Sequence, residues 1–239
     1  MQLQRKLTDL YEKLLKSYGY QGWWPLYFSI PSGATNGYFK KGCHPRDYDF
    51  PQNSAQKLEI CLGAILTQNT KWQNVVPALR ELKTSNLFSL TALRKANSEQ
   101  IAVAIKSAGY YNQKSQTIKR LVNFLRTHSF GKLKDESTPV VREKLLAIKG
   151  IGPETADCIL LYALDKTSFV IDAYTTRICM QLGIIDKKMS YDELKYLFES
   201  SLEKKKELFQ EYHALLVCHG KMYYSRKPYG VSDPLINFE

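Results

Sequence analysis

The amino-acid sequence predicts an all-α fold of about ten helices joined by short connections. Three observations lead to this prediction. Apolar residues recur at helical spacing in successive segments, cap residues or Gly and Pro separate those segments, and no segment shows the alternating pattern of a strand of useful length. The 239 residues are enough for one large domain or two small ones with a well-buried core.

The chain is strongly basic, with a formal net charge of +11 at pH 7. This charge favours a polyanionic partner, and the alternative is a basic soluble protein that binds none. No long apolar run and no signal peptide are present, which predicts a cytoplasmic protein, nucleoid-associated if the polyanion is DNA, without a membrane partner. Five scattered cysteines, an odd number, argue against a disulfide framework.

The first predicted helix covers residues 3–18 and ends near Gly19. A loop follows, in which large aromatic residues such as Trp23 and Trp24 are commonly core anchors, here for this helix. Residues 26–56 are rich in Gly, Pro, Ser and Asn without a helical period, so a surface loop is the default interpretation. This segment also has candidate metal ligands that fall short of a tetrahedral set, namely Cys43, His44, Asp47 and Asp49.

Apolar spacing predicts further helices on both sides of the segment TQNTKW. One covers Leu58 to Leu66, and the period returns at Val75, where Pro77 must lie in the first turn or kink the helix. Two short helices follow, with Ser89 and Ser98 as N-caps. The segment GYYNQK then opens a longer helix with the apolar residues Ile118, Leu121, Val122 and Leu125.

The segment LLAIKGIGPETADCILLYALDKTSFVIDAYTTR predicts two helices joined by a very short hairpin. The dipeptide Thr138-Pro139 begins the first helix, as N-cap and first helical residue. Gly150 and Gly152 flank the hairpin, where the chain needs positive φ and close backbone approach. Pro153 starts the second helix, whose free N–H groups form an anion site suited to nucleic-acid phosphate. One apolar stripe follows, formed by Ala156, Ile159, Leu160, Ala163 and Leu164.

The last part of the chain predicts three more helices. Asp172 caps one that ends at Gly183. Ser190 and Glu193 form a capping box for the next. The last amphipathic helix ends before Pro228.

This ordered set of motifs resembles the helix-hairpin-helix, endonuclease III-like DNA glycosylases over about residues 56–227. The segments WWP, LGAILTQNTKW and GYYNQK are most similar to the monofunctional 3-methyladenine DNA glycosylase branch without an iron–sulfur cluster. The resemblance implies two helical lobes with a cleft for a flipped nucleotide. Residues 56–165 would form a central helical barrel ending in the hairpin. Residues 1–55, with the insertion 26–56, and 166–239, with the catalytic aspartate, would form the other lobe.

The implied activity is base-excision repair, in which a monomer hydrolyses the N-glycosidic bond of a damaged nucleotide flipped out of double-stranded DNA. Asp172 stands where the family has its catalytic aspartate and would stabilise the sugar cation or orient water; the alternative is a plain N-cap. Glu154 stands where bifunctional members have a lysine, so we expect a monofunctional enzyme that leaves an abasic site.

Base recognition is implied by aromatic residues of the same branch. Trp72 matches a stacking aromatic of the branch, and its pocket wall would consist of Trp23, Trp24 and Pro25. Aromatic faces attract an N-methylated, cationic purine, which favours an alkylated base such as 3-methyladenine. The alternatives are a glycosylase for an oxidised or mismatched base and a non-catalytic DNA-binding protein.

The resemblance also implies DNA contacts and a structural cation. Gln68 would bond the orphaned base and Tyr110 would wedge between base steps, although Tyr110 could also be ordinary packing under a loop. Phosphates would be held by the amides of Gly150, Gly152, Glu154 and Thr155 and by Lys149. A monovalent cation or Mg²⁺ would be held by the carbonyls of Leu146, Ile148 and Ile151.

No other cofactor is expected. Many relatives hold an iron–sulfur cluster with four C-terminal cysteines, but tyrosines stand there in HGKMYYSRKPYG, with only Cys218 nearby. His219 and Lys221, in the same segment, lie near the site by resemblance without an assigned role.

Overall fold

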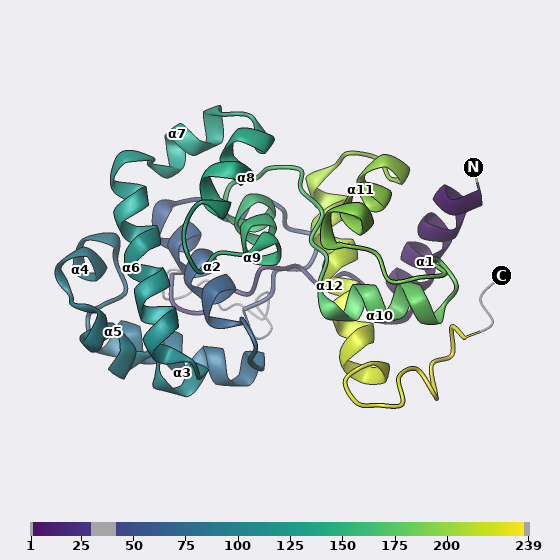
Figure 1. Cartoon of the computed structure of the whole chain (residues 1–239), viewed down its shortest axis with the longest axis horizontal. Coiled ribbons are helices and arrows are strands. Elements are labelled where there is room, and N and C mark those ends of the chain that lie inside the picture. Colours follow the sequence, from purple (N-terminus) through teal and green to yellow (C-terminus); the bar gives the residue numbers. More distant parts are fainter. Residues whose placement is uncertain (1, 30–41, 237–239) are drawn as a thin grey trace. The chain divides into compact units, whose positions relative to one another are not determined.

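The computed structural model describes residues 2–29 and 42–236, which fall into two compact units (Figure 1). The central unit comprises Trp24–Gly42 and Asp49–Lys166, and the terminal unit comprises Met1–Trp23, Cys43–Tyr48 and Thr167–Glu239. The predicted all-α fold is confirmed, because the described ranges contain helices and no strand. None of the helices in these ranges has the length and the apolar character needed to cross a membrane.

The central unit is built around a buried helix, α2, whose residues from Leu58 to Leu66 are all buried. This helix packs against α3, α6, α9 and the π-helix that follows α9. The α-helices of the unit are α2 (Ser54–Leu66), α3 (Trp72–Thr84), α4 (Leu90–Lys95), α5 (Ser98–Ala104), α6 (Tyr111–Thr127), α7 (Phe130–Asp135), α8 (Thr138–Leu146) and α9 (Pro153–Cys158). A 3₁₀ helix, Lys106–Ala108, precedes α6, and the π-helix is Ile159–Ala163.

Several predicted helix starts are displaced by a few residues. The polar first turn of α2 begins at Ser54, inside the predicted loop, because the Asn53 side chain caps it and no apolar period marks it. Helix α3 begins at Trp72, so Pro77 lies in its second turn rather than its first. The cap of α5 is Asn97 and not Ser98, and the cap of α8 is Ser137 and not Thr138. The predicted cap Ser89 is confirmed.

The second hairpin helix also differs from the expectation of one continuous α-helix. It begins at Pro153 as predicted, but from Ile159 it continues as a π-helix. Every member of the predicted apolar stripe is buried. A π segment is common at functional sites, and here it carries the buried Tyr162 against the ring of Trp24, with centroids 5.3 Å apart.

The terminal unit contains α1 (Gln2–Tyr18), α10 (Ala173–Gln181), α11 (Tyr191–Ser201) and α12 (Lys206–Tyr223). Helix α12 packs against α1 and α10. The predicted N-cap Asp172 and the capping box of Ser190 and Glu193 are confirmed. The Tyr212 hydroxyl on α12 donates to the Leu7 carbonyl on α1 over 2.8 Å, which joins the two ends of the chain. Residues 30–41 of the predicted loop lie outside the described residues.

Candidate active site and nucleic-acid interface

The hairpin between α8 and α9 is a tight turn that requires glycine at position 150. The Ile151 amide donates to the Ile148 carbonyl over 2.9 Å, and Gly150 has a φ of 102°. A Cβ at Gly150 would lie 2.1 Å from Oγ1 of Thr117 on α6, so the predicted close approach is confirmed there. The prediction is wrong for Gly152, whose φ is −93° and whose Cβ would meet open space.

An ion pair joins the two helices of the hairpin, and an arginine of α6 bonds its turn. Arg142 on α8 and Asp157 on α9 form an ion pair with Nε and Oδ1 3.0 Å apart, and the aspartate side chain is fully buried. Arg120 on α6 donates from a terminal guanidinium nitrogen to the Lys149 carbonyl over 3.2 Å. The side chains of Lys149 and Glu154 are exposed. The hairpin backbone is therefore fixed while these two side chains face solvent.

Gln68, in the loop 67–71 between α2 and α3, lies on the hairpin. Its Nε2 donates to the Gly150 carbonyl over 3.0 Å and to the Thr155 hydroxyl over 2.9 Å. An amide NH₂ group has only two N–H donors, and both are used here. A hydrogen bond from this nitrogen to an orphaned base would therefore replace one of these two hydrogen bonds. The structure thus gives Gln68 a positioning contact that the sequence did not indicate.

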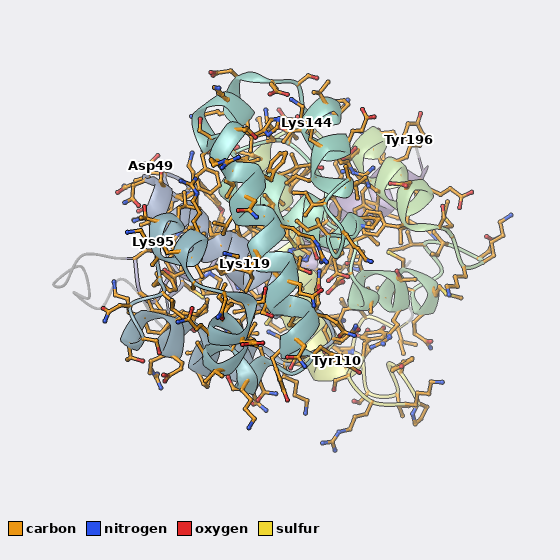
Figure 2. The ribbon with its side chains drawn as sticks, turned by 60° about the vertical axis from the view of Figure 1, so that its left-hand side comes forward. Asp49, Lys95, Tyr110, Lys119, Lys144 and Tyr196 are labelled. Carbon is orange, nitrogen blue, oxygen red and sulfur yellow. The ribbon has the colours of Figure 1, made fainter. Side chains whose placement is uncertain are left out.

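Tyr110 is exposed in a strained backbone conformation. Its φ of 47° and ψ of 31° are left-handed, and this region costs a non-glycine residue roughly 1–2 kcal/mol. The side chain is 65% exposed at the N-terminal end of α6 (Figure 2), so the alternative of ordinary packing under a loop is wrong. Strain of this kind concentrates at functional sites.

An aromatic group in the central unit contains two of the predicted pocket residues. The Trp24 and Trp72 rings meet edge to face with centroids 5.4 Å apart. Trp24 is buried and packs on Gly63 of α2, so it is a core residue of this unit and not an anchor for α1. Pro25 is also buried. Among the described residues the buried Nε1 of Trp72 has no hydrogen-bond partner, which ordinary core packing avoids.

Tyr27 belongs to the same aromatic group and was not predicted. Its ring centroid lies 6.5 Å from that of Trp72. Glu59 on α2 holds the backbone there, accepting from the amides of Tyr27 over 2.6 Å and Ser29 over 2.9 Å. Burial raises the pKa of Glu59 although these hydrogen bonds act in the opposite direction. A buried glutamate at the centre of an apolar helix was the signal in the sequence, because such a residue requires polar partners.

In the terminal unit, the two carboxylate oxygens of Asp172 differ in their hydrogen bonds. Its Oδ1 accepts from the amide and from the hydroxyl of Thr175, both over 2.7 Å. Within the described part of the chain Oδ2 has no partner, and the residue is half-buried. The carboxylate lies at the N-terminus of α10, the positive end of the helix dipole. The geometry therefore provides a fixed anion with one oxygen available to a ligand.

Trp23, His213 and Lys221 lie together in the terminal unit. Trp23 meets His213 edge to face at 5.9 Å, and Nζ of Lys221 lies 5.3 Å from the Trp23 ring centroid. Burial lowers the pKa of His213 to about 4, against the opposing effect of Asp172, so this imidazole is neutral at neutral pH. Burial also lowers the pKa of Lys221, and Cys218 and Asp172 oppose the shift. His213 was not predicted; its position two helical turns before Lys221 was the available signal.

His219 lies in a separate buried network of the terminal unit. Its two ring nitrogens bond the Tyr18 hydroxyl at 2.7 Å and Oδ2 of Asp233 at 3.0 Å. The Tyr224 hydroxyl donates to the same Asp233 oxygen over 2.5 Å. These groups bond one another, and Cys218 is the only thiol in the described C-terminal segment 218–236. This donor set does not fit an iron–sulfur cluster.

A structural cation at the hairpin would need carbonyl oxygens with a lone pair to spare. The Ile148 carbonyl accepts one amide and keeps a second lone pair. Carbonyl oxygens of this kind, here also those of Leu146 and Ile151, are the hard ligands that Mg²⁺ and similar cations take. No group of three or more His, Cys, Asp or Glu side chains in the described ranges could hold a metal ion; within the predicted loop, His44 bonds the Asp47 carbonyl at 2.6 Å.

Three comparisons relate this chain to known proteins. Residues 62–204 match the family model described as "HhH-GPD superfamily base excision DNA repair protein". The chain is 36% identical over 237 residues to a putative DNA repair glycosylase of Methanocaldococcus jannaschii, with 97% of this chain and 94% of the relative covered.

Among solved structures, the chain is similar to the H. pylori 3-methyladenine DNA glycosylase bound to 1,N6-ethenoadenine. The identity is 28%, the TM-score 0.66, and the match covers 92% of this chain and 96% of the other. It is also similar in fold to a trapped endonuclease III–DNA covalent intermediate, at 14% identity and a TM-score of 0.68 over 94% and 89% of the two chains. The predicted endonuclease III-like fold is confirmed.

Proposed function

Because the chain belongs to the HhH-GPD superfamily of base excision DNA repair proteins and is a DNA glycosylase of that group, we propose that it is a monofunctional enzyme for damaged purines. It hydrolyses the N-glycosidic bond of an alkylated purine, of the 3-methyladenine type, flipped out of double-stranded DNA, and leaves an abasic site. It acts as a monomer in the cytoplasm, at the nucleoid.

The observation that carries this proposal is the carboxylate of Asp172. One oxygen is fixed by Thr175 and the other has no partner in the described part of the chain. Departure of a purine leaves positive charge on the sugar, and a fixed anion beside that charge lowers the barrier or orients the attacking water. His213 supports this role because it stays neutral and does not compete with the sugar for the anion.

Glu154 supports a monofunctional reaction. A lyase needs an amine that attacks the sugar and forms a Schiff base. A glutamate at the start of α9 cannot do so, and Lys149 lies on the other side of the turn. The exposed Lys149 and the amides of the hairpin would instead contact phosphate.

The aromatic residues support an alkylated purine, and one observation favours a second candidate. The partly exposed Trp72 offers a π face that attracts a cationic base, and the buried Trp24 supports it edge to face. The Lys221 ammonium, however, lies over the Trp23 ring and would repel such a base there. A neutral lesion with a hydrogen-bond acceptor fits Lys221 better. The H. pylori 3-methyladenine DNA glycosylase has been solved with 1,N6-ethenoadenine, a neutral base.

We further infer that the enzyme needs no iron–sulfur cluster and that its hairpin binds a monovalent cation or Mg²⁺ through carbonyls. The His219–Asp233 network occupies the C-terminal segment with oxygen and nitrogen donors in place of thiolates. Purified protein is therefore expected to be colourless and iron-free, as checked by its visible spectrum and by metal analysis. A brown preparation with stoichiometric iron would contradict this.

The proposed function is tested by incubating the protein with duplexes that carry 3-methyladenine, 1,N6-ethenoadenine, 8-oxoguanine or a mismatch, followed by analysis with and without alkali. We expect release of the alkylated or etheno base, and strand breaks only after alkali. Asp172→Asn should abolish release while DNA binding persists, whereas the matched control Asp192→Asn, in the first turn of α11, should not. Breaks without alkali would indicate a lyase. No release from any duplex would indicate a non-catalytic DNA-binding protein.

A further inference from the structure

One buried ammonium bonds the backbone at the start of two loops of the central unit. Lys114 on α6 is 3% exposed. Its Nζ donates to the Leu66 carbonyl over 2.9 Å and to the Ala108 carbonyl over 2.8 Å. Leu66 is the last residue of α2, directly before the loop 67–71, and Ala108 ends the 3₁₀ helix, directly before Gly109 and Tyr110. The same charged group therefore fixes the starting points of both loops.

The same face of α6 also fixes the hairpin. Thr117 and Arg120 follow Lys114 at intervals of three residues, which places all three on one side of the helix. Thr117 closely approaches Gly150, and Arg120 bonds the Lys149 carbonyl. Gln68 completes the arrangement, because it joins the loop 67–71 to the hairpin. Side chains on one face of α6 thus contact the backbone of the two loops and of the hairpin.

We propose that Lys114 is a positioning residue that sets the spacing of the loops 67–71 and 108–110, so that Gln68 and Tyr110 enter the duplex together. This inference rests on the proposed glycosylase function and deepens it. Extruding a base requires its stack to be opened and the gap to be filled. Two side chains on separate loops can do this in one step only when their loops hold a fixed separation. Hydrogen bonds from a charged donor to two carbonyls are strong and directional enough to keep this separation constant.

Lys119 offers a matched control on the same helix (Figure 2). Its Nζ donates to the carbonyls of Leu93, Arg94 and Ala96 at the end of α4. Like Lys114, it caps a helix end from α6, but it bonds no residue of the two loops or of the hairpin. Lys119→Met therefore removes a similar contact without freeing the loops.

The test compares Lys114→Met with Lys119→Met at a temperature at which circular dichroism shows both to be folded. The substrate is a duplex that carries 1,N6-ethenoadenine beside 2-aminopurine, whose fluorescence rises when the stack opens. We expect Lys114→Met to lose at least tenfold in single-turnover base release and most of the fluorescence rise. Lys119→Met should stay within twofold of the wild type, and both variants should bind undamaged duplex as the wild type does.

Two outcomes would overturn the proposal: release and fluorescence within twofold of the wild type in Lys114→Met, or equal losses in both variants. If Lys114→Met does not fold, Lys114→Arg is compared with Lys119→Arg, and the longer side chain should reduce the fluorescence rise only at position 114. A wild type that releases no base contradicts the proposed function, and the fluorescence comparison then decides this inference alone. A wild type that gives no fluorescence rise overturns it as well.

Discussion

The hairpin region of the central unit and the C-terminal segment of the terminal unit are both irregular, but different kinds of bond hold them. In the hairpin region, residues 67–71, 108–110 and 147–152, side chains of α6 and Gln68 donate to backbone carbonyls. The C-terminal segment, residues 224–236, is held by bonds between side chains: Asp233 bonds Tyr224 and His219 of α12, and His219 bonds Tyr18 of α1. The first arrangement fixes a backbone and leaves the side chains of Tyr110 and Lys149 exposed. The second secures a chain end, so its loss should reduce stability more than activity.

The largest effect on the hairpin region is expected from its buried ion pair. Asp157→Asn removes the negative charge that pairs with Arg142, and breaking such a buried pair should lower the free energy of unfolding by about 3 kcal/mol. Phosphate binding should weaken with it, because α8 and α9 lose their link. Urea unfolding and duplex titration measure the two effects.

The control is Glu136→Gln, which removes a half-exposed pair with Lys144 on α8 and should cost less than about 1 kcal/mol. Equal losses in both would show that the buried pair has no special role.

Lowering the pH should destabilise the terminal unit through protonation of His213, which extends the comparison. Its pKa is lowered by burial to about 4, below its ordinary value of 6.5. The stability that the neutral imidazole contributes is complete above pH 6.5 and is lost as the pH falls towards 4. The loss is roughly 3 kcal/mol. His213→Gln should flatten this part of the stability–pH curve in urea titrations between pH 4 and 7. An unchanged slope in the variant would show that another group titrates.

A smaller effect is expected at the aromatic group beside the loop 67–71. Trp72→Ala should lower excision of the preferred lesion by about ten- to a hundredfold, since stacking is worth roughly 1–3 kcal/mol per base. Non-specific affinity and its salt dependence should not change, because phosphate contacts dominate them. Single-turnover release and salt titrations measure the two quantities. Phe124→Ala, at a half-buried aromatic stacked on His128, should leave excision unchanged. Normal excision by Trp72→Ala would make Trp72 a core residue.

Local sequence rules predicted most of the fold. The N-caps Ser89, Asp172 and Ser190 and the long helix after GYYNQK were correct because their signals are confined to a few adjacent residues. Errors arose where two candidates adjoin: Asn97 precedes Ser98 and Ser137 precedes Thr138, and either residue type can cap a helix. Helix α7 was missed, since its six residues are too few to show a period.

The site was harder to predict because its contacts join residues far apart in the chain. The Gln68 bond to the hairpin, the Glu59 bonds to residues 27–29 and the position of His213 each depend on packing between elements. The π-helix had no sequence signal. Motif resemblance could propose Asp172 and the hairpin as candidates, because the residues of each motif are adjacent in sequence.

The positive charge available to DNA could not be judged from the sequence alone. The net charge of +11 predicted a polyanionic partner, but several lysines use their ammonium groups inside the fold. Lys114, Lys119, Lys166 and Lys195 each donate to backbone carbonyls. Burial lowers the pKa of Lys114 to about 8, so it remains mostly charged at neutral pH. The positive surface available to DNA is smaller than the sequence total suggests.

The most direct test of the comparison measures stability and base release on one variant from each region. Gln68→Ala removes two bonds to the hairpin, and Tyr18→Phe removes one bond to His219 in the buried network. We predict that Gln68→Ala slows single-turnover release at least tenfold with little change in the free energy of unfolding. Tyr18→Phe should cost about 1 kcal/mol of stability without slowing release under folded conditions. Release unchanged in Gln68→Ala, or slowed equally in both variants, would contradict the account.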